Sequence, residues 1–200
     1  LIVFFLGLIV SIAGSDNGLY YGRYPVLVIC LMVSFFVHWL AFIPAYIRRT
    51  EKFYDISGTI AYICVLFTVL VLTKSVSGGV LNFRSWLVII LVSVWALRLG
   101  FFLFIRVLKA GEDRRFREVK QKFSAFLVWW TISALWVFFT TVNALVMIIN
   151  NVDYYDDYFL YIGLLLWVVG FSFEVIADEQ KRRFRSKPLN REKFISSGLW

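Results

Sequence analysis

The sequence predicts an all-α fold, a polytopic bundle of about six transmembrane helices. Of its 200 residues, 60% are hydrophobic and only 17% are charged, so the chain has too few polar side chains to cover a water-facing surface. Apolar stretches recur along it, each close to the ~20 residues that a helix needs to cross a hydrocarbon core. Stretches such as 87–97 and 159–169 are almost continuously apolar instead of alternating, which argues against a transmembrane barrel.

Short polar segments separate the predicted spans. These spans lie at 1–14, 26–47, 53–73, 86–108, 125–149 and 158–176. The first begins inside an apolar run at Leu1, without an initiator Met. The second, fourth and sixth end where basic residues begin, the third leads into a loop poor in basic residues, and the fifth ends before the acidic segment 150–157. We expect both ends of the chain to be cut from a longer protein.

Basic side chains predict the orientation in the membrane. They follow the second span (Arg48, Arg49 and Lys52), the fourth (from Arg106 to Lys122) and the sixth (from Lys181 to Lys193). Segment 150–157 holds Asp residues and neither Lys nor Arg. By the positive-inside rule, the basic connections and the amino-terminal side face the cytoplasm. Topology signals and anionic headgroups also account for the net charge of +8, so we expect membrane lipids and no nucleic acid as partners.

The expected organisation is one transmembrane helical domain over 1–200, with 179–200 as a cytoplasmic segment. The sequence contains no internal repeat and no extended Pro/Gly/Ser linker that would mark a boundary. Cys30 and Cys64 both lie inside predicted spans, where a thiol behaves as a small apolar group. Their spacing predicts neither a disulfide nor a metal site.

Polar residues at membrane depth are the natural functional candidates, because they are costly there and usually face a bundle interior or a wet cavity. They are His38, Asp55, Arg98, Asn143 and Glu174. Arg98 stands out because apolar residues flank it on both sides. We expect its partner to be Asp55, Glu174 or a ligand phosphate. The alternative to a functional role is that Arg98 forms an internal ion pair that only fixes helix packing. For His38 we expect a hydrogen-bonded packing residue.

A second group of charges follows the sixth span. If the helix continues past Glu174, then Glu174, Asp178, Arg182 and Arg185 share one face as a polar stripe. Guanidinium forks bind phosphate oxygens and carboxylates bind ribose hydroxyls, so the stripe suits an anionic cofactor. The stripe could also be an anchor among lipid headgroups, and composition alone favours this second interpretation.

The same segments resemble a known family. The resemblance rests on Trp95-Ala-Leu-Arg98-Leu-Gly with Arg106 and Gly111-Glu-Asp-Arg-Arg-Phe116, on Asp178-Glu-Gln-Lys-Arg-Arg-Phe-Arg-Ser-Lys-Pro188, on Lys193-Phe-Ile-Ser-Ser-Gly-Leu-Trp200, and on Phe53-Tyr-Asp-Ile-Ser-Gly58. In this order and spacing they look like the steroid 5α-reductase-like superfamily, specifically its bacterial branch labelled as a domain of unknown function. The matches run from about Phe53 to Trp200.

The resemblance implies an all-helical membrane reductase that takes NADPH in a cavity open to the cytoplasm and reduces an activated carbon–carbon double bond. A lipid-like or steroid-like enone would be the substrate, and the bacterial inner membrane the location. Cofactor contacts are implied for Arg98, Arg106, Asp113, Arg114, Glu174, Asp178, Arg182 and Arg185. Asp55, with Tyr54, would be the catalytic acid that polarises the substrate carbonyl.

Some positions depart from the family pattern. Trp95 stands where the steroid reductases have a Tyr, and Glu174 where they have an Asn. An indole nitrogen can donate a hydrogen bond, but it is not a proton donor of phenol strength. The family also continues after the Gly-Leu-Trp into an Arg-His-Pro-Asn-Tyr-like element, whereas this chain stops at Trp200. The alternatives are a membrane methyltransferase of the isoprenylcysteine type, which uses S-adenosylmethionine, and a non-catalytic membrane protein.

Overall fold

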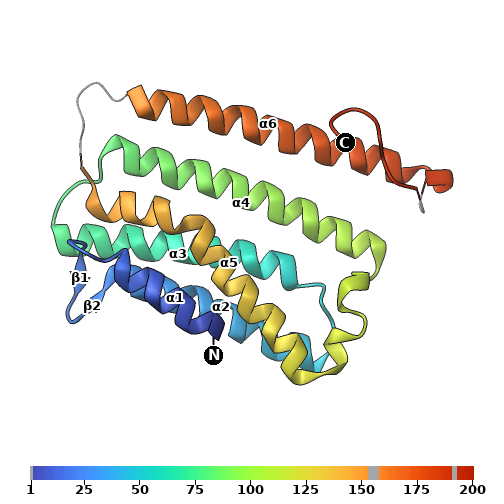
Figure 1. Cartoon of the computed structure of the whole chain (residues 1–200), viewed down its shortest axis with the longest axis horizontal. Coiled ribbons are helices and arrows are strands. Elements are labelled where there is room, and N and C mark those ends of the chain that lie inside the picture. Colours follow the sequence, from blue (N-terminus) through green and yellow to red (C-terminus); the bar gives the residue numbers. More distant parts are fainter. Residues whose placement is uncertain (1, 153–157, 191–192) are drawn as a thin grey trace. The chain divides into compact units, whose positions relative to one another are not determined.

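Long apolar helices make up most of the computed structural model, which describes residues 2–152, 158–190 and 193–200 (Figure 1). Five of the described helices are long and apolar enough to cross a membrane: α2 (Val26–Ile47), α3 (Tyr54–Ser77), α4 (Phe83–Ala110), α5 (Phe123–Asn150) and α6 (Tyr158–Ser186). The predicted all-α transmembrane bundle is therefore confirmed. The protein is an integral multi-pass membrane protein, and its spanning helices contact membrane lipid.

The element bounds differ from the prediction in physically explicable ways. The helix predicted at 1–14 is α1 (Ile2–Ala13), whose 12 residues are fewer than the ~20 needed to cross a hydrocarbon core. Helix α4 starts three residues before the predicted 86, because the Asn82 side chain caps it by accepting from the backbone N–H of Ser85 (2.8 Å). Helix α6 continues past the predicted end at 176 to Ser186. This last part is too polar to have been predicted as part of the span, and ion pairs of Glu179 with Arg182 and Arg183 support its helical form.

A small hairpin between α1 and α2 was not predicted. Strands β1 (Tyr20–Tyr21) and β2 (Tyr24–Pro25) pair antiparallel, with Tyr21 opposite Tyr24. The turn depends on Gly22, whose φ of +62° lies in the left-handed region that glycine occupies without steric cost.

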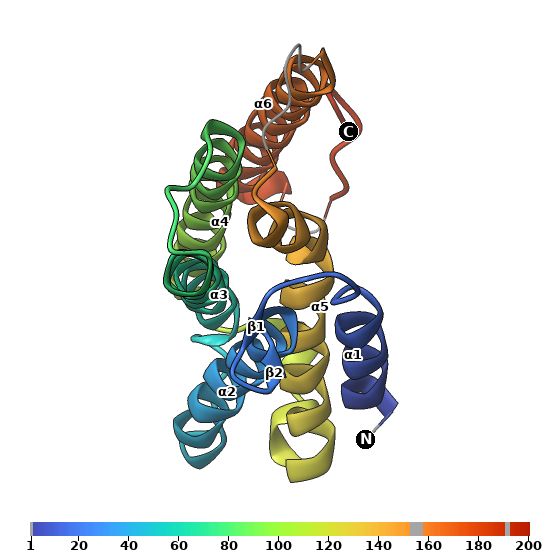
Figure 2. The ribbon, with the colours of Figure 1, turned by 90° about the vertical axis from the view of Figure 1, so that its left-hand side faces the viewer.

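The chain divides into two compact units, Leu1–Asp153 and Tyr154–Trp200. In the first unit, α2 packs against both α3 and α5, α3 packs against α4, and α1 lies along α2 and α5 (Figure 2). The core of this unit is formed by fully buried side chains of α2, α3 and α5, including Phe35, Val65 and Phe138. The expectation of a single domain over 1–200 stays a prediction.

The backbones of α3 and α4 come close together at Gly100. A Cβ placed on Gly100 of α4 would lie 1.7 Å from the Thr59 hydroxyl of α3, so only glycine fits there. The Thr59 hydroxyl in turn donates to the backbone carbonyl of Ala96 (3.4 Å). Small residues at helix contacts are typical of membrane bundles, because they let the backbones come together.

One end of the first unit carries its basic connections, and we call it the basic end. Here α2 ends, α3 begins, and the loop 111–122 leads from α4 to α5 through two short 3₁₀ turns, η1 (Arg114–Phe116) and η2 (Val119–Gln121). A second apolar cluster lies at this end, and it includes the buried rings of Phe42, Phe126 and Trp130. This cluster holds the loop against the helix ends.

In the second unit the chain turns back onto α6 after the short turn η3 (Pro188–Asn190). The backbone N–H of Leu199 donates to the Gln180 side chain (2.9 Å), and the Trp200 indole donates to the backbone carbonyl of Ala177 (2.8 Å). The ammonium of Lys181 lies 3.8 Å from the centre of the Trp200 ring. The Gly-Leu-Trp segment is therefore docked on the carboxy-terminal half of α6.

Candidate functional site

A carboxylate of one helix and a guanidinium of another lie close together at the basic end. Asp55 lies in the first turn of α3, where the helix dipole favours a negative charge. Its carboxylate is 4.0 Å from the guanidinium of Arg106, near the end of α4. The side chain of Asp55 is 14% exposed and that of Arg106 is 43% exposed, so the pair spans the boundary between the packed interior and the surface. The structure thus brings together two residues that the sequence placed in the site.

Tyr54, the residue before Asp55, points into the aromatic cluster. Its hydroxyl donates to the backbone carbonyl of Trp129 on α5 (3.1 Å). Its ring packs against Phe116, with 4.7 Å between the ring centres, and against Trp130, with 5.3 Å. The phenol therefore ties the first turn of α3 to α5, and this contact fixes where the neighbouring carboxylate of Asp55 lies.

Asp113 and Arg115 of the loop 111–122 add a second carboxylate and a second guanidinium to the basic end. The Arg115 guanidinium donates to both carboxylate oxygens of Asp113, and both residues act electrostatically on Asp55. The hydrogen bond from Arg115 holds the pKa of Asp113 below its usual value. Asp113 is thus at the predicted site, while the side chain of Arg114 lies outside the described part of the structure.

A buried ion pair fastens the loop to the basic end. The side chain of Glu51 is 2% exposed, and its carboxylate is 2.8 Å from the ammonium of Lys120, which is 15% exposed. The other Glu51 oxygen accepts the backbone N–H of Asp113 (2.8 Å). Phe116, 1% exposed, inserts between Tyr54 and the rings of α5. The loop that carries Asp113 and Arg115 is therefore held by contacts of both kinds, charged at Glu51 and apolar at Phe116.

Arg98 lies about two turns before Arg106 on α4. It is half-buried, and its guanidinium carbon is 5.3 Å from the centre of the Phe102 ring. Trp95, one turn earlier, packs edge-on against Tyr62 of α3 with 5.3 Å between ring centres. The partner that the structure gives Asp55 is Arg106, which is one of the predicted cofactor residues.

The predicted stripe of charges is on a continuous helix, because α6 extends through Arg185. Glu174 and Asp178 are half-buried, whereas Arg182 and Arg185 are exposed. Arg182 donates to both oxygens of Glu179 (2.6 and 2.7 Å), and Arg183 donates to Glu179 as well (2.6 Å). Glu179 thus engages the arginine that was expected to bind cofactor phosphate.

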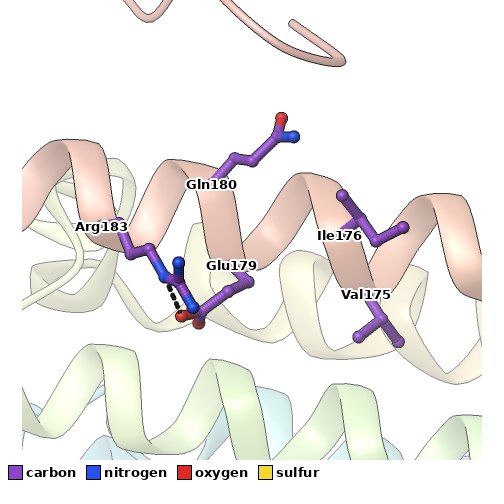
Figure 3. Close-up of a pocket in the computed structure, with 5 residues that line it drawn as sticks. All are labelled: Val175, Ile176, Glu179, Gln180 and Arg183. Carbon is purple, nitrogen blue, oxygen red and sulfur yellow. Dashed lines mark hydrogen bonds and ion pairs between the residues drawn. The ribbon is translucent and has the colours of Figure 1, made fainter.

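A hollow runs along α6 (Figure 3). It is lined by Val175, Ile176, Glu179, Gln180 and Arg183. On a helix of ~3.6 residues per turn, these positions occupy a different face from the stripe Glu174–Arg185. The hollow combines an apolar end with a Glu–Arg ion pair, so the described lining is amphipathic.

The structure also places residues that the sequence analysis missed. Glu51, Arg115 and Lys120 were given no role there, because a charge in a basic loop is usually solvated, and Phe116 was named only as part of the motif that ends at it. A weak signal was available, since Glu51 is the acidic residue of the otherwise basic segment 48–52. Among the described residues, no three His, Cys, Asp or Glu side chains lie close enough together to hold a metal ion.

Comparison with known proteins identifies the family of this chain. No curated protein and no solved structure matches this chain at a significant level. A family described as "Protein of unknown function (DUF1295)" matches residues 41–200, which include the basic end, the Asp55–Arg106 pair and the whole of α6. The chain therefore belongs to the DUF1295 family.

Proposed function

We propose that this protein is a membrane-embedded reductase that uses NADPH to reduce an activated carbon–carbon double bond in a lipid-like enone. The observation that carries the proposal is the Asp55–Arg106 pair, in which an acid at a helix start faces a half-exposed guanidinium across 4.0 Å. The family match supports it, because residues 41–200 contain every segment that resembles the steroid 5α-reductase-like superfamily.

The cationic groups at the basic end fit a dinucleotide phosphate. The side chains of Arg106 and Arg115 are 43% and 55% exposed, so both are accessible to a ligand although each already contacts a carboxylate. Arginine binds phosphate through paired N–H donors, and such charge-assisted bonds are stronger than neutral ones. Arg98, Arg182 and Arg185 remain further candidates for this role. NADPH, when bound, supplies the hydride.

The acid of the site would be Asp55. Reduction of an enone places negative charge on the carbonyl oxygen, and a positioned proton donor or cation stabilises that charge. Asp55 is held against Arg106, and the packed rings of Phe116 and Trp130 keep water from one side of its turn. Asp55 would act in its protonated form as the donor to that oxygen, and low water content would strengthen the attraction of the neighbouring Arg106 cation for the same charge.

The same proposal includes an orientation. We place the basic end, with Asp55 and Arg106, on the cytoplasmic side of a bacterial inner membrane, because Arg48, Arg49 and the loop 111–122 satisfy the positive-inside rule there. A cytoplasmic site has direct access to NADPH, while the spanning helices give a lipid-like substrate access from the bilayer. Lipid metabolism is the corresponding cellular role.

Ligand-dependent stability tests the cofactor class. The full-length protein is purified in detergent and its melting temperature is measured against NADPH and against S-adenosylmethionine. The proposal predicts a rise with NADPH, since a ligand at 100 times its dissociation constant stabilises by about 2.7 kcal/mol. The rise should diminish in Arg98→Ala and Arg182→Ala if those residues bind the cofactor. A rise with S-adenosylmethionine alone would favour the methyltransferase, and no rise with either would favour a non-catalytic protein.

A further inference from the structure

Exposed aromatic side chains gather at the end of the first unit that lies opposite the basic end, and we call it the aromatic end. The β1–β2 hairpin is located there, together with the end of α3 and the start of α4 (Figure 1). Tyr20, Tyr21 and Tyr24 of the hairpin are 50%, 53% and 67% exposed. These rings are therefore accessible to a partner outside the packed core of the unit.

The hairpin is held firmly against the helices. Leu19, just before it, packs on the apolar core, and its backbone carbonyl accepts the backbone N–H of Val26 (3.0 Å). Strand β1 contacts α3, and β2 leads directly into α2 through Pro25. Because these contacts fix the hairpin, its three phenols keep a defined position relative to the spanning helices.

Two helices add a cation and an indole to the aromatic end. Lys74 is in the last turn of α3, and its ammonium lies 5.0 Å from the centre of the Trp86 ring at the start of α4. Both side chains are exposed, as is Arg23 in the hairpin turn. Tyrosine and tryptophan combine an apolar ring with a polar group, and lysine extends its charge beyond an apolar stem. Each is therefore suited to the boundary between hydrocarbon and water.

The length of α2 separates the two ends by the thickness of a membrane. Its 22 residues rise by about 33 Å in all, close to the ~30 Å of a hydrocarbon core. At its far end the guanidinium carbon of Arg49 lies 4.0 Å from the centre of the Tyr46 ring. When Tyr46 and Arg49 lie at one membrane surface, Tyr24 is therefore at the level of the other.

Between these levels α2 buries its polar side chains. His38 is fully buried, with Nδ1 2.8 Å from the backbone carbonyl of Ser34 and Nε2 3.1 Å from the hydroxyl of Ser133 on α5. The expectation that His38 is a hydrogen-bonded packing residue is confirmed. The exposed side chains of α2, all of which the structure describes, are apolar or aromatic: Met32, Phe36, Trp39, Leu40, Ile43, Pro44 and Ile47. This face suits hydrocarbon over the whole length of the helix.

We infer that the aromatic end is an interfacial anchor, which binds the phospholipid headgroup region of the leaflet opposite the basic end. The phenol hydroxyls, the indole of Trp86 and the cations of Arg23 and Lys74 bind phosphate and ester oxygens, while the rings lie against the first acyl carbons. This contact fixes the depth of the bundle in the bilayer. The anchor does not depend on the proposed activity, and only the naming of its leaflet as the non-cytoplasmic one rests on the proposed orientation.

The depth of a spin label tests where the hairpin lies. Cys30→Ala and Cys64→Ala remove the native thiols, and a nitroxide is attached at Arg23→Cys, Phe36→Cys or Lys122→Cys in phosphatidylcholine vesicles. Collisions with oxygen report the hydrocarbon, and collisions with a water-soluble nickel chelate report water. The label in the middle of α2 should meet mainly oxygen, and the label in the exposed loop mainly the chelate. The hairpin label should meet both at intermediate rates.

Two results would overturn the inference. A label at Arg23→Cys that meets the chelate as freely as the label at Lys122→Cys would place the hairpin in water. A label at Arg23→Cys that meets neither reagent would show that protein covers the hairpin, as a second copy of the chain would. Failure of NADPH to bind would instead remove the proposed function and leave this result untouched.

A second measurement tests whether the rings set the depth. Replacing all three hairpin tyrosines by serine should raise the chelate collisions of the Arg23→Cys label and should shift the depth of the Phe36→Cys label. The strands pair through backbone groups, so the fold should persist. Val80→Ser is the control, because Val80 is an exposed apolar residue at the same end and its replacement removes no aromatic ring. Unchanged depths in the serine variant, or equal changes in the control, would contradict the anchor.

Discussion

The carboxylate of Glu51 and the ammonium of Lys120 lie 2.8 Å apart and are both largely buried, although each comes from a connection that is rich in basic residues. Glu51 stands just before α3, and Lys120 lies in the loop between α4 and α5. Their contact joins the two connections at the basic end. It holds the loop segment that brings Asp113 and Arg115 to the Asp55–Arg106 pair.

Loss of Lys120 should therefore destabilise the protein. Lys120→Met leaves the Glu51 carboxylate buried without its cation, at a cost of about 3 kcal/mol. The measurement is the melting temperature in detergent. Lys122→Met is the control, because Lys122 is an exposed lysine of the same loop and its loss should have little effect.

The double variant Glu51→Gln with Lys120→Met separates charge from packing. Since it removes both charges, it should recover much of the stability that Lys120→Met loses. If Lys120→Met melts at the temperature of the parent protein, the pair does not hold the loop.

Gly100 should be intolerant of even one added methyl group. In Gly100→Ala the new Cβ would stand 1.7 Å from the Thr59 hydroxyl, so α3 and α4 must move apart. Overpacking of this kind costs about 1–3 kcal/mol.

Gly58→Ala is the matched control, because a Cβ at that helical position meets nothing within 4 Å. Alanine there should be neutral or should stabilise by about 0.5 kcal/mol. Melting temperatures of both variants check the contact, and a Gly100→Ala protein as stable as Gly58→Ala would show that the two helices are not in close contact.

Acid should loosen the loop through Asp113. Because Arg115 lowers the pKa of Asp113 in the folded protein, the Asp113 carboxylate contributes stability above its unfolded pKa of about 3.9. That contribution is lost as the pH falls through the lower, folded value. The difference in melting temperature between the parent and Asp113→Asn should therefore be constant above about pH 5 and should shrink below about pH 4. A difference that grows on acidification would contradict the assigned direction.

Most of the fold could be predicted from hydropathy, because in a bilayer a long apolar segment has few alternatives to a helix. The second span matched α2 residue for residue. The helix ends were less predictable, since Asn82 extends α4 through a side-chain cap and the Glu179 ion pairs accompany the polar end of α6. Such local contacts are not visible in an apolar run.

Part of the candidate site was also predictable. Asp55, Tyr54, Arg106 and Asp113 were named from the sequence, and the structure brings them together at the basic end. The identity of the arginine that pairs with Asp55 was less predictable. Arg98 and Arg106 are about two helical turns apart on α4, and only the packing of α3 on α4 selects between them. The hydrogen bond from the Tyr54 hydroxyl to the Trp129 carbonyl joins α3 to α5, so no spacing in the sequence could reveal it.

The binding of NADPH to Arg106 variants tests the central claim most directly. The dissociation constant is measured in detergent for the parent, for Arg106→Gln, and for Arg117→Gln, a control in the neighbouring loop whose exposed arginine pairs with Glu112. A guanidinium that binds phosphate contributes about 1.5–3 kcal/mol, so Arg106→Gln should weaken binding by about 10-fold or more. Arg117→Gln should bind as the parent does. Parent-like affinity in Arg106→Gln, or no binding of NADPH to the parent, would contradict the account.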